Sequence, residues 1–597
     1  MNNHFRCMAL RGLSLFTAAA LLTACAASQA AAPATSESTA HEAVTFMAPY
    51  LNVEAFIDKV HSIYPEVNIE IVPYSGDNTT SCIQNMIEAH DLPDICTVTV
   101  YNPMTDDMSD QLIDLAGYDF TDNYIESRLQ EVTDNGAIYL LPSVYNCYGI
   151  TYNKTLLQQN GWTVPTSFAE LEQLAEKAEA AGVALCLPQS QYPGYGFQYM
   201  CNIADADFLG TLDGKRWQKD YLSGKANVSG TPGMMETMAY IQKWRDIGML
   251  NGDGDPTSDE VTRQRMINGD ALFLLGSTNG IVEADGTRDK FGLMPYLSED
   301  GSQNVFVLSV NRYFGLNKRL EQNPQKLEDA LKVMRVLSTV EGTTALYPET
   351  KVKSSLMPFK NAKAHDTYYA DVADALNFGS TAPFIYSGWE NTIVTTGNKM
   401  LDFMRGDATI DEVIAQLDAD QDKVVNNTPD LITTAAEDIP QEDCARLVGR
   451  CFAEATGSDL ALVSLGTWIS GNPTEQNHYG VSGKLYAKGL TDYDLSVILP
   501  TGWNRTIQTV TLNGSQINDL LTEGYDAYGN GKCYPYVLVS PAAVQEDKTY
   551  QVAICGVSDK LAAEVGMDAA KAFFGSFETL SRANAAWDET EPQNVEG

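Results

Sequence analysis

Short hydrophobic runs, most of them followed by helical patterns, organise the first part of this 597-residue chain. Apolar residues fill alternate positions or unbroken runs over residues 44–47, 67–72 and 94–98, and these three segments predict strands. The first two are each followed by a stretch with helical spacing. Strands that alternate with helices are typical of a largely parallel sheet covered by helices. The pattern therefore predicts an α/β fold.

Helix-start and helix-stop signals support the same interpretation further along the chain. Ser167 and Glu170 have the spacing of a capping box, and Gly182 follows the last residue of that apolar pattern. Asn323 and Pro324 provide a cap followed by a proline that suits the first helical turn. We expect a helix to begin at each of these caps.

The last 165 or so residues carry a second set of α/β signals, enough for another domain. Thr409 and Glu412 form a predicted capping box for the helix that precedes it. The tail itself predicts a helix over 440–455 closed by Gly457, strands over 460–465 and 506–512, a capping box at Thr491 and Asp494, and a helix through Ile517.

Composition narrows the classes of partner and chemistry. The chain has 78 acidic against 39 basic residues and a formal charge of -39, which disfavours nucleic acid as a partner. Only six histidines are present, so a metal site that needs several imidazoles is poorly supplied. Nine cysteines follow Cys25 without any CxxC pair, and we expect them to be small buried hydrophobic residues.

The N-terminus has the organisation of a targeting segment. Arg6 and Arg11 supply positive charge, and the apolar run from Gly12 to Leu22 is too short to span a bilayer. Residues 22–25, Leu-Thr-Ala-Cys, resemble the lipobox of bacterial lipoproteins. The resemblance implies removal of a signal peptide over 1–24 and a lipid on Cys25, which would anchor the protein to the outer face of the cell membrane. The small, polar residues after Cys25, to residue 42, predict a flexible tether.

The order of several short segments is more informative than any one of them. The segments are 93–95 (PDI), 141–142 (LP), 149–154 (GITYNK), 161–171 (GWTVPTSFAEL), 268–273 (NGDALF) and 338–342 (STVEG). In this order they resemble the extracellular solute-binding proteins of ABC importers, especially the carbohydrate group known as family 1. The resemblance covers about 44–427. It implies a two-lobed, hinged periplasmic-binding-protein fold of type II over 43–430, which captures a carbohydrate for membrane permease subunits.

Candidate solute contacts follow from where ligands bind in such folds, at the carboxyl ends of strands. The residues predicted on this rule are Tyr50, Asn52, Tyr101, Asn102, Ser277, Thr278 and Asn279. Two aromatic residues, Tyr195 in a turn-rich loop and Trp389, are further candidates, because sugars present apolar C–H faces that stack on rings. In the family, a glycine-tryptophan pair usually follows the strand that here ends at Leu275, and Gly276 and Ser277 replace it.

The tail over 436–597 resembles the C-terminal domain of 5'-nucleotidases. The segments that carry this resemblance are 455–462, 489–500, 510–514 and 548–553. The family's nucleotide-binding glycine run is replaced by 464–469, and its proline-phenylalanine-glycine-asparagine motif by 500–504. The resemblance therefore implies a separate α/β domain that has the fold without the family's ligand site.

Two classes of function remain open at this point, a binding protein and a surface enzyme of nucleotide salvage. Metallophosphatases need Asp-x-His and Asn-His-[Asp/Glu] motifs, and the chain has neither, which favours a binding protein without metal or cofactor. A nucleoside-binding role for the tail and a peptide or other polar solute for the lobes are the remaining alternatives. Asp253, Asp255 and Asp259 hint at a calcium loop, but Ser258 and Gln264 occupy the positions that need Gly and Glu.

Overall fold

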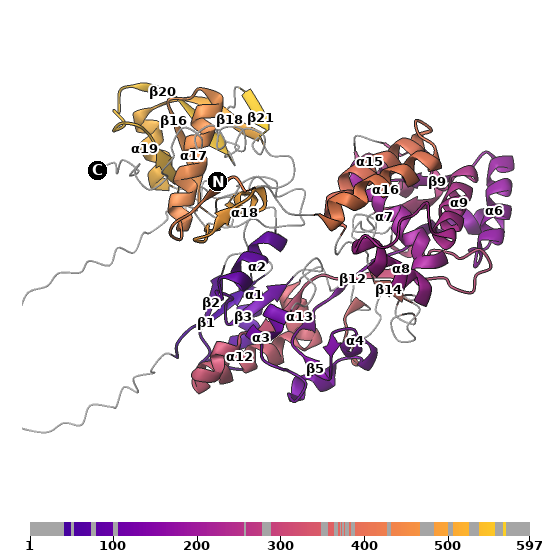
Figure 1. The fold of residues 1–597 in the computed structure, drawn as a ribbon, viewed down its shortest axis with the longest axis horizontal. Coiled ribbons are helices and arrows are strands. Elements are labelled where there is room, and N and C mark those ends of the chain that lie inside the picture. Colours follow the sequence, from indigo (N-terminus) through magenta and orange to yellow (C-terminus); the bar gives the residue numbers. More distant parts are fainter. Residues whose placement is uncertain are drawn as a thin grey trace, which may run out of the picture.

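The structure is a computed structural model, and it describes most of the chain between residues 41 and 568. The described residues are 41–48, 53–72, 79–98, 106–252, 254–255, 258–276, 288–347, 356–362, 368–369, 372, 375, 381–383, 389–426, 431–465, 481, 483–498, 506–523, 536–555 and 565–568. They form three bodies (Figure 1). We name these lobe 1 (described residues of 41–142 and 313–362), lobe 2 (150–294 and 389–426) and the C-terminal domain (431–568).

Lobe 1 is built on a five-stranded sheet with the order β2-β1-β3-β13-β6. Its strands are β1 (Val44–Met47), β2 (Ile69–Val72), β3 (Ile95–Val98), β6 (Leu141–Pro142) and β13 (Tyr313–Leu316), with a separate hairpin of β4 (Thr133–Asp134) and β5 (Ala137–Ile138). Its helices are α1 (Glu54–His61), α2 (Thr79–Glu88), α3 (Asp106–Gln111), α4 (Glu126–Gln130), α12 (Pro324–Leu337) and α13 (Val340–Leu346). The three predicted strands are therefore present and belong to one sheet.

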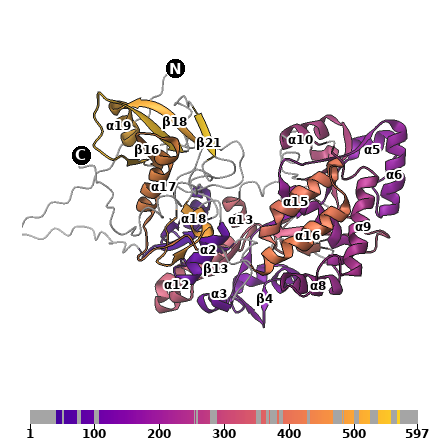
Figure 2. The same cartoon turned by 45° about the horizontal axis from the view of Figure 1, so that its top comes forward.

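Lobe 2 is built on a four-stranded sheet with the order β11-β8-β10-β9. Its strands are β8 (Ile150–Asn153), β9 (Ala184–Pro188), β10 (Ala271–Leu275) and β11 (Phe291–Met294). Its helices are α5 (Lys154–Asn160), α6 (Phe168–Ala181), α7 (Pro193–Ala204), α8 (Leu212–Leu222), α9 (Pro232–Asp246), α10 (Asp259–Asn268), α15 (Glu390–Arg405) and α16 (Ile410–Val425). Figure 2 shows α15 and α16 side by side on this lobe, and the two helices are in contact.

A third sheet, β14-β12-β7, joins the two lobes. It consists of β7 (Tyr145–Tyr148), β12 (Phe306–Val310) and β14 (Thr381–Pro383). β7 lies between β6 of lobe 1 and β8 of lobe 2 in the chain, and β12 lies between β11 of lobe 2 and β13 of lobe 1. These two strands pair antiparallel, so the chain passes from lobe 1 to lobe 2 along β7 and back to lobe 1 along β12 within one sheet. We call β7 and β12 the hinge strands.

The prediction of largely parallel sheets is wrong for the strands next to the hinge. β1 is parallel to β2 and β3, and β9 is parallel to β10, as expected. However, β13 is antiparallel to β3, and β8 is antiparallel to β10. The reason is that β13 and β8 enter their lobes directly from a hinge strand, with no helix to return the chain to the other end of the sheet.

Hydrophobic packing connects the two lobes through the hinge. One cluster of buried residues includes Phe46 of lobe 1, Leu308 of β12 and Leu274 of β10. A second cluster includes Phe273 of β10 and the helical residue Trp244. The sheet of lobe 2 is therefore buried on both sides, and the first cluster continues without a break from lobe 1 to lobe 2.

The C-terminal domain has its own sheet and its own core. Its five-stranded sheet has the order β19-β16-β20-β18-β21. The elements are β15 (Thr433–Thr434), α17 (Gln441–Thr456), β16 (Leu460–Ser464), β17 (Gly489–Leu490), α18 (Asp492–Ile498), β18 (Thr506–Asn513), α19 (Gly514–Glu523), β19 (Tyr536–Val539), β20 (Thr549–Cys555) and β21 (Val565–Asp568). Its two hydrophobic clusters contain residues of this domain alone. A separate α/β unit at the end of the chain is thus observed, and its likeness to a nucleotidase domain stays a prediction.

The helix caps show how far local signals determine these elements. Thr409 and Glu412 form the predicted capping box of α16, with both reciprocal hydrogen bonds. The Ser167 hydroxyl accepts from the Glu170 N–H at the start of α6, but the Glu170 carboxylate accepts from the N–H of Thr166 instead of Ser167. The second half of that predicted capping box is therefore wrong by one residue.

Seven cysteines are buried, as expected of small hydrophobic residues: Cys82, Cys96, Cys147, Cys186, Cys201, Cys444 and Cys451. Burial raises the pKa of the Cys96 and Cys451 thiols to about 12. These thiols are therefore protonated at neutral pH and poor nucleophiles.

Candidate functional site

The carboxyl ends of the parallel strands lie beside the hinge in both lobes. In lobe 1, Val98 at the end of β3 pairs with Tyr313, which begins β13 shortly after hinge strand β12. In lobe 2, Leu274 near the end of β10 pairs with Thr151, near the start of β8 directly after hinge strand β7. The edges where ligands bind in α/β sheets are thus the hinge-facing edges of the two lobes.

The crossing into lobe 2 is closely packed at Gly149, the residue between β7 and β8. A Cβ atom at this position would lie 2.7 Å from the carbonyl oxygen of Met294 and 2.9 Å from the Cγ of Leu293. A side chain here would push β8 away from β11. Glycine therefore keeps the lobe 2 sheet and its hinge-facing edge next to the hinge strand.

Tyr199 ties together the two strand ends at the hinge-facing edge of lobe 2. Its hydroxyl lies 2.8 Å from the carbonyl oxygen of Gln189, which directly follows β9, and 3.0 Å from that of Leu275, the last residue of β10. Gly276 follows with a φ of +130°, and a Cβ there would lie 2.1 Å from Oε1 of Gln189. Gly276 therefore lies tightly against the buried Gln189 side chain at the end of β10.

A stack of tyrosine rings begins at the same edge. Tyr192 is the N-terminal cap residue of α7, and Pro193 occupies its first turn. The ring centroids of Tyr192 and Tyr195 lie 6.2 Å apart, and those of Tyr195 and Tyr199 lie 6.1 Å apart. Tyr192 and Tyr195 are half-buried, whereas Tyr199 is fully buried. The two outer rings provide apolar surface next to water, which suits the C–H face of a sugar.

Asp259, the first residue of α10, places a carboxylate beside these rings. Its Oδ2 accepts a hydrogen bond of 2.9 Å from the Tyr195 hydroxyl, and its N–H donates to Oε1 of Gln191 at 3.2 Å. The other oxygen, Oδ1, is buried and has no hydrogen-bond partner among the described residues. A buried carboxylate oxygen without a donor is costly, so this atom is an unsatisfied acceptor beside the rings.

The electrostatics of the pair follow from burial. Burial raises the pKa of Asp259 above its usual value, although the Tyr195 hydroxyl, the nearby Arg263 and the Gln191 amide partly offset it. Burial, followed by the charge of Asp259, raises the pKa of Tyr195 well above its usual range. Tyr195 is therefore a hydrogen-bond donor over the physiological pH range, and Asp259 is the group whose charge responds to acid.

Most of the predicted site residues fall outside the described residues. These are Tyr50, Asn52, Tyr101, Asn102, Ser277, Thr278 and Asn279, and Cys25 lies outside them as well. They follow the ends of β1, β3 and β10 in the chain, where the hinge-facing edges are. Their contact with a solute stays a prediction.

Two predicted site residues are described, and their surroundings differ. Tyr195 belongs to the edge just described. Trp389 precedes α15, is 3% exposed and stacks on Tyr221 with ring centroids 4.5 Å apart and planes at 6°. Phe197 and Trp217 also contact its ring. The structure gives Trp389 a packing role in the core of lobe 2, and its contact with a solute stays a prediction.

Asp259 and Gln191 are site residues that the sequence did not single out. In the sequence, Asp259 belongs to the GDGDPTSDE stretch that hints at a calcium loop, and Gln191 belongs to the loop that contains Tyr195. The useful signal was that Ser258 and Asp259 open a helix just before β10, because α10 then begins at the edge where β9 ends. No spacing rule pairs residues 64 positions apart, as Tyr195 and Asp259 are.

Within the described ranges, no three His, Cys, Asp or Glu side chains come together as a metal site would require. Over those ranges, too, the helices are all too short or too polar to cross a bilayer. Of the tail segments where the nucleotidase-like motifs are altered, 464–469 and 500–504, residues 466–469 and 500–504 lie outside the described residues.

Comparison with known families agrees with this arrangement of lobes and hinge. Residues 54–373 match the family described as bacterial extracellular solute-binding protein. The match spans more than half of the chain, and this protein therefore belongs to that family.

Individual relatives are more distant. The maltodextrin-binding protein MdxE of Bacillus subtilis is 25% identical over 185 residues, which are 29% of this chain and 40% of that protein. The chain thus spans less than half the length of this curated relative. An open structure of the binding protein MsmE of Bacillus subtilis has a TM-score of 0.52 at 13% identity and covers 65% of this chain and 99% of its own.

A family 1 extracellular solute-binding protein of Bifidobacterium longum subsp. infantis has a TM-score of 0.50 at 16% identity, covering 63% of this chain and 98% of its own. At such low sequence identity, these two structures show only that the fold is shared.

Proposed function

We propose that this protein captures a carbohydrate between its two lobes and delivers it to the permease subunits of an ABC importer. The observation that carries the proposal is the pair of half-exposed rings, Tyr192 and Tyr195, beside the unpartnered carboxylate oxygen of Asp259. This pair lies on the hinge-facing edge of a protein of the solute-binding family. The names of its relatives, among them a maltodextrin-binding protein, support a sugar as the solute.

The geometry explains how a sugar would be held. The C–H face of one ring would lie on Tyr192 or Tyr195, and a hydroxyl would donate to Oδ1 of Asp259. Movement of lobe 1 toward lobe 2 about β7 and β12 would then cover the solute and exclude water, which strengthens each hydrogen bond. No bond is made or broken, so the chain acts by binding and release.

The test is a calorimetric titration with a panel of monosaccharides and oligosaccharides, alongside peptides and nucleosides. We expect a sugar to bind, and Asp259→Asn to weaken it about 10-fold to 100-fold, because hydrogen bonds to charged groups contribute about 1.5–3 kcal/mol. Asp270→Asn is the matched control, since Asp270 is exposed and directly precedes β10 at the opposite edge of the same sheet. Saturation by a peptide with no response to any sugar would overturn the carbohydrate proposal.

We propose in addition that Cys25 carries a lipid that anchors the protein outside the cell membrane. The support is the Leu-Thr-Ala-Cys sequence that ends the apolar run of the N-terminus. Cells that express Cys25→Ala should release the protein or retain its precursor, and they should incorporate no labelled fatty acid into it. Unchanged labelling would refute the assignment.

The C-terminal domain is proposed to have no hydrolase activity. The support is the absence from the full sequence of the histidine-containing motifs of metallophosphatases. Incubation of the purified chain with AMP, a UDP-sugar and a chromogenic phosphate ester should give no turnover with manganese, zinc or cobalt. Metal-dependent turnover that is lost in His478→Ala would revive the nucleotide-salvage alternative.

A further inference from the structure

The chain leaves lobe 2 at a firmly held helix. α16 is the last helix of the lobe, and the carbonyl oxygen of its Leu417 accepts a hydrogen bond of 2.6 Å from the Tyr221 hydroxyl. The Asp418 carboxylate accepts from the backbone N–H of Val228 at 2.7 Å. The chain is thus fixed to lobe 2 almost to the end of α16 at Val425.

The C-terminal domain begins only a few residues later. The N–H of Ile432 donates to the carbonyl oxygen of Leu490 at 2.8 Å, and Thr433 pairs with Leu490 across β15 and β17. From Asn426, which caps α16, to Ile432 is a distance of six peptide units, and such a chain spans at most about 20 Å. The domain is therefore covalently tied to lobe 2 by a short connection.

The same domain is docked on the other lobe through Lys488. Its Nζ donates to Oδ1 of Asn85 at 2.8 Å and to Oε2 of Glu88 at 2.9 Å, both in α2 of lobe 1. Lys488 also pairs with the buried Asp494 of its own domain at 3.0 Å. Burial opposes the charge of Lys488, but the hydrogen bonds to Glu88 and Asp494 outweigh it and raise its pKa. Lys488 is therefore a cation at neutral pH that links the two domains.

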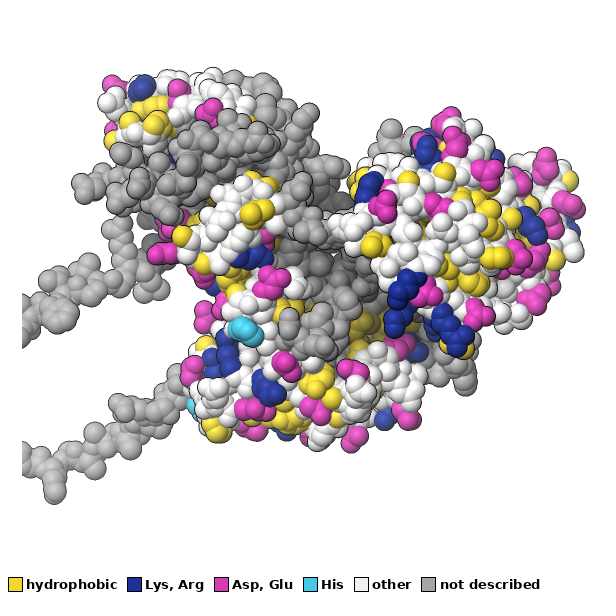
Figure 3. Space-filling model, in the orientation of Figure 1, with side chains coloured by type: hydrophobic (Ala, Val, Ile, Leu, Met, Phe, Trp, Pro, Cys, Tyr) yellow, Lys and Arg dark blue, Asp and Glu magenta, His cyan; other side chains and the backbone are white. Residues whose placement is uncertain are grey.

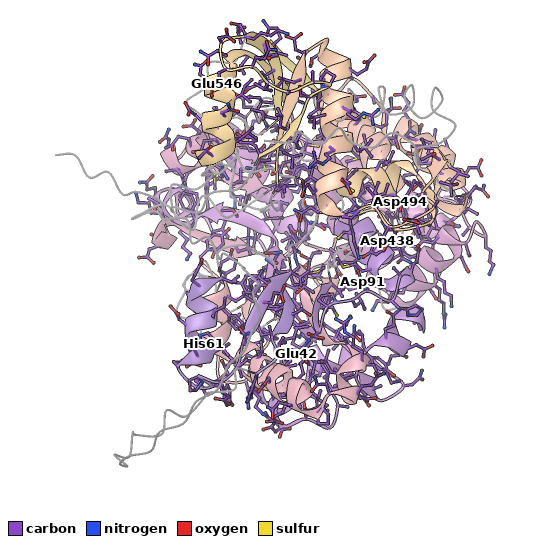
Figure 4. All side chains as sticks on the ribbon, turned by 90° about the vertical axis from the view of Figure 1, so that its left-hand side faces the viewer. Glu42, His61, Asp91, Asp438, Asp494 and Glu546 are labelled. Atoms are coloured by element: carbon purple, nitrogen blue, oxygen red, sulfur yellow. The ribbon has the colours of Figure 1, made fainter. Side chains whose placement is uncertain are left out.

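A second set of contacts converges on Asp91, just after α2. Its Oδ2 accepts a hydrogen bond of 3.0 Å from the Tyr486 hydroxyl and forms an ion pair of 2.5 Å with Nζ of Lys484. Within the C-terminal domain, Asp438 accepts from the N–H of Ala487 at 2.9 Å and holds this segment in place. Asp91, Asp438 and Asp494 lie close together where the two domains meet (Figure 4).

This contact surface, which we call the seam, combines hydrogen bonds and ion pairs with an incompletely filled cavity whose lining is largely apolar. The hydrophobic clusters of the C-terminal domain contain no residue of lobe 1, and the lobe 1 cluster that includes Ile83 of α2 contains no residue of the C-terminal domain. A cavity of about 410 Å³ lies in the seam; Val72, Met86, Asp91, Pro440, Lys484 and Tyr486 are among the residues that line it. Figure 3 shows basic and acidic side chains next to each other where the domains meet. None of these hydrophobic clusters spans the seam.

We infer that the C-terminal domain is an intramolecular brace, tied to lobe 2 by the chain and docked on lobe 1 through Lys484, Tyr486 and Lys488, which restrains the movement of the lobes. In this docked state Tyr192 and Tyr195 keep part of their surface exposed, and the Tyr195 hydroxyl and the Asp259 N–H bond within lobe 2, so the two rings are not covered by lobe 1. Docking then favours separated lobes and opposes solute capture. The effect on solute affinity rests on the proposed function, whereas the docking of the C-terminal domain on lobe 1 does not.

The test begins without solute, on the purified full chain. The double substitution Glu88→Lys and Asp91→Lys places positive charges opposite Lys488 and Lys484. The Glu88 and Asp91 side chains are 47% and 44% exposed, so lysine can be accommodated at both positions. Small-angle X-ray scattering should show a larger radius of gyration for this double variant. Glu172→Lys with Glu176→Lys, two exposed residues of α6 in lobe 2, is the control with the same change of charge and should leave the profile unchanged.

Wild-type protein gives a second measurement that needs no variant. Raising salt from about 0.1 M to about 1 M shortens the Debye length from about 10 Å to about 3 Å and should produce the same expansion. An unchanged profile in both the double variant and high salt would overturn the docking. If no solute binds at all, the proposed function fails and these two results still decide the docking.

With a solute in hand, the double variant should bind it about fivefold or more tightly, a coupling at the lower end of those usual between linked equilibria. Because coupling is reciprocal, saturating solute should also lower the salt concentration at which the domain is released. Unchanged or weaker affinity in a variant that has expanded would overturn the brace while leaving the binding function intact.

Discussion

The C-terminal domain and lobe 2 are both attached to lobe 1, but by opposite kinds of contact. At the hinge, β7 and β12 pair over four residues on each strand, and Tyr145, Phe306 and Leu308 belong to a hydrophobic cluster that continues into both lobes. At the seam, three side chains of the C-terminal domain make hydrogen bonds and ion pairs around a cavity. Figures 1 and 2 show the two junctions on different sides of lobe 1.

The difference indicates what each junction can do. A hydrophobic hinge with paired strands can bend but cannot come apart without exposing its core. An ionic seam weakens when salt screens its charges, and it leaves two folded bodies behind when it opens. The molecule therefore combines one permanent junction with one that is reversible, and each can be perturbed separately.

The largest loss of stability in the hydrophobic part of the molecule is expected at Trp389. Replacement by alanine removes a ring that is 3% exposed and stacked on Tyr221, and we expect a loss of about 3–5 kcal/mol in the free energy of unfolding of the lobes. Chemical denaturation followed by tryptophan fluorescence measures it, with Trp389→Phe as the milder control. A fully stable variant that only loses solute affinity would contradict the packing role and restore the predicted solute contact.

Leu308→Ala tests the hinge itself. Leu308 is 5% exposed in β12, and its truncation should lower the stability of the two lobes by about 2–5 kcal/mol. The unfolding transition of the C-terminal domain should stay where it is, because that domain has a separate core. Calorimetric scans resolve the two transitions. Leu431→Ala is the control, since that leucine is 66% exposed. A shift of the C-terminal transition by the same amount would show that the domains are one cooperative unit.

The pH dependence of solute affinity should come from lobe 2 and not from the seam. We expect the solute hydroxyl to donate to the ionised carboxylate of Asp259. Solute affinity should therefore be highest above the raised pKa of Asp259 and should fall as the pH drops through that pKa. The fall should begin at a higher pH than it would for an aspartate of pKa 3.8. The stability of the solute-free protein should depend on pH in the opposite direction. A raised carboxyl pKa favours the protonated folded state, so the contribution of Asp259 to the free energy of unfolding falls as the pH rises through that pKa.

Titrations between about pH 7 and about pH 4 measure this dependence on the chain and on Asp259→Asn. The variant should bind weakly with a flat profile. Persistence of the wild-type profile in the variant would assign the pH dependence to another group.

The smallest effect is expected at Tyr486. Tyr486→Phe removes one hydrogen bond to Asp91 and leaves Lys484 in place, so docking should weaken by about 0.5–1.5 kcal/mol. The salt concentration that releases the C-terminal domain should fall, and the unfolding of the lobes should be unchanged. An identical release midpoint would show that Asp91 is held by Lys484 alone.

The sequence could predict the elements on either side of the two junctions, but not the contacts that form the junctions. Local signals gave the caps of α16 and α17 and the strands β1, β3, β16 and β18, because a few neighbouring side chains determine each of them. The antiparallel β8 and β13 were missed, since their direction depends on where the chain re-enters a lobe. Lys488 and Glu88 are 400 residues apart, and no local pattern distinguishes them from other exposed charges.

The candidate site divides in the same way. Tyr195 was predicted from a turn-rich loop that exposes aromatic residues, which is a local signal. Its partner Asp259 and the tie that Tyr199 makes between β9 and β10 depend on strand order, which periodicity does not contain. Trp389 is a residue type that often stacks on sugars, and only its contacts with rings of α7 and α8 show that it is enclosed.

Hydrogen exchange of the wild-type chain at low and high salt tests the central claim most directly, because one experiment reports on both junctions. We predict that about 1 M salt raises the exchange of amides in α2 and residues 483–498 at the seam, while those of hinge strands β7 and β12 stay protected. Equal loss of protection at both junctions, or none at either, would contradict the account of a permanent hinge and a reversible brace.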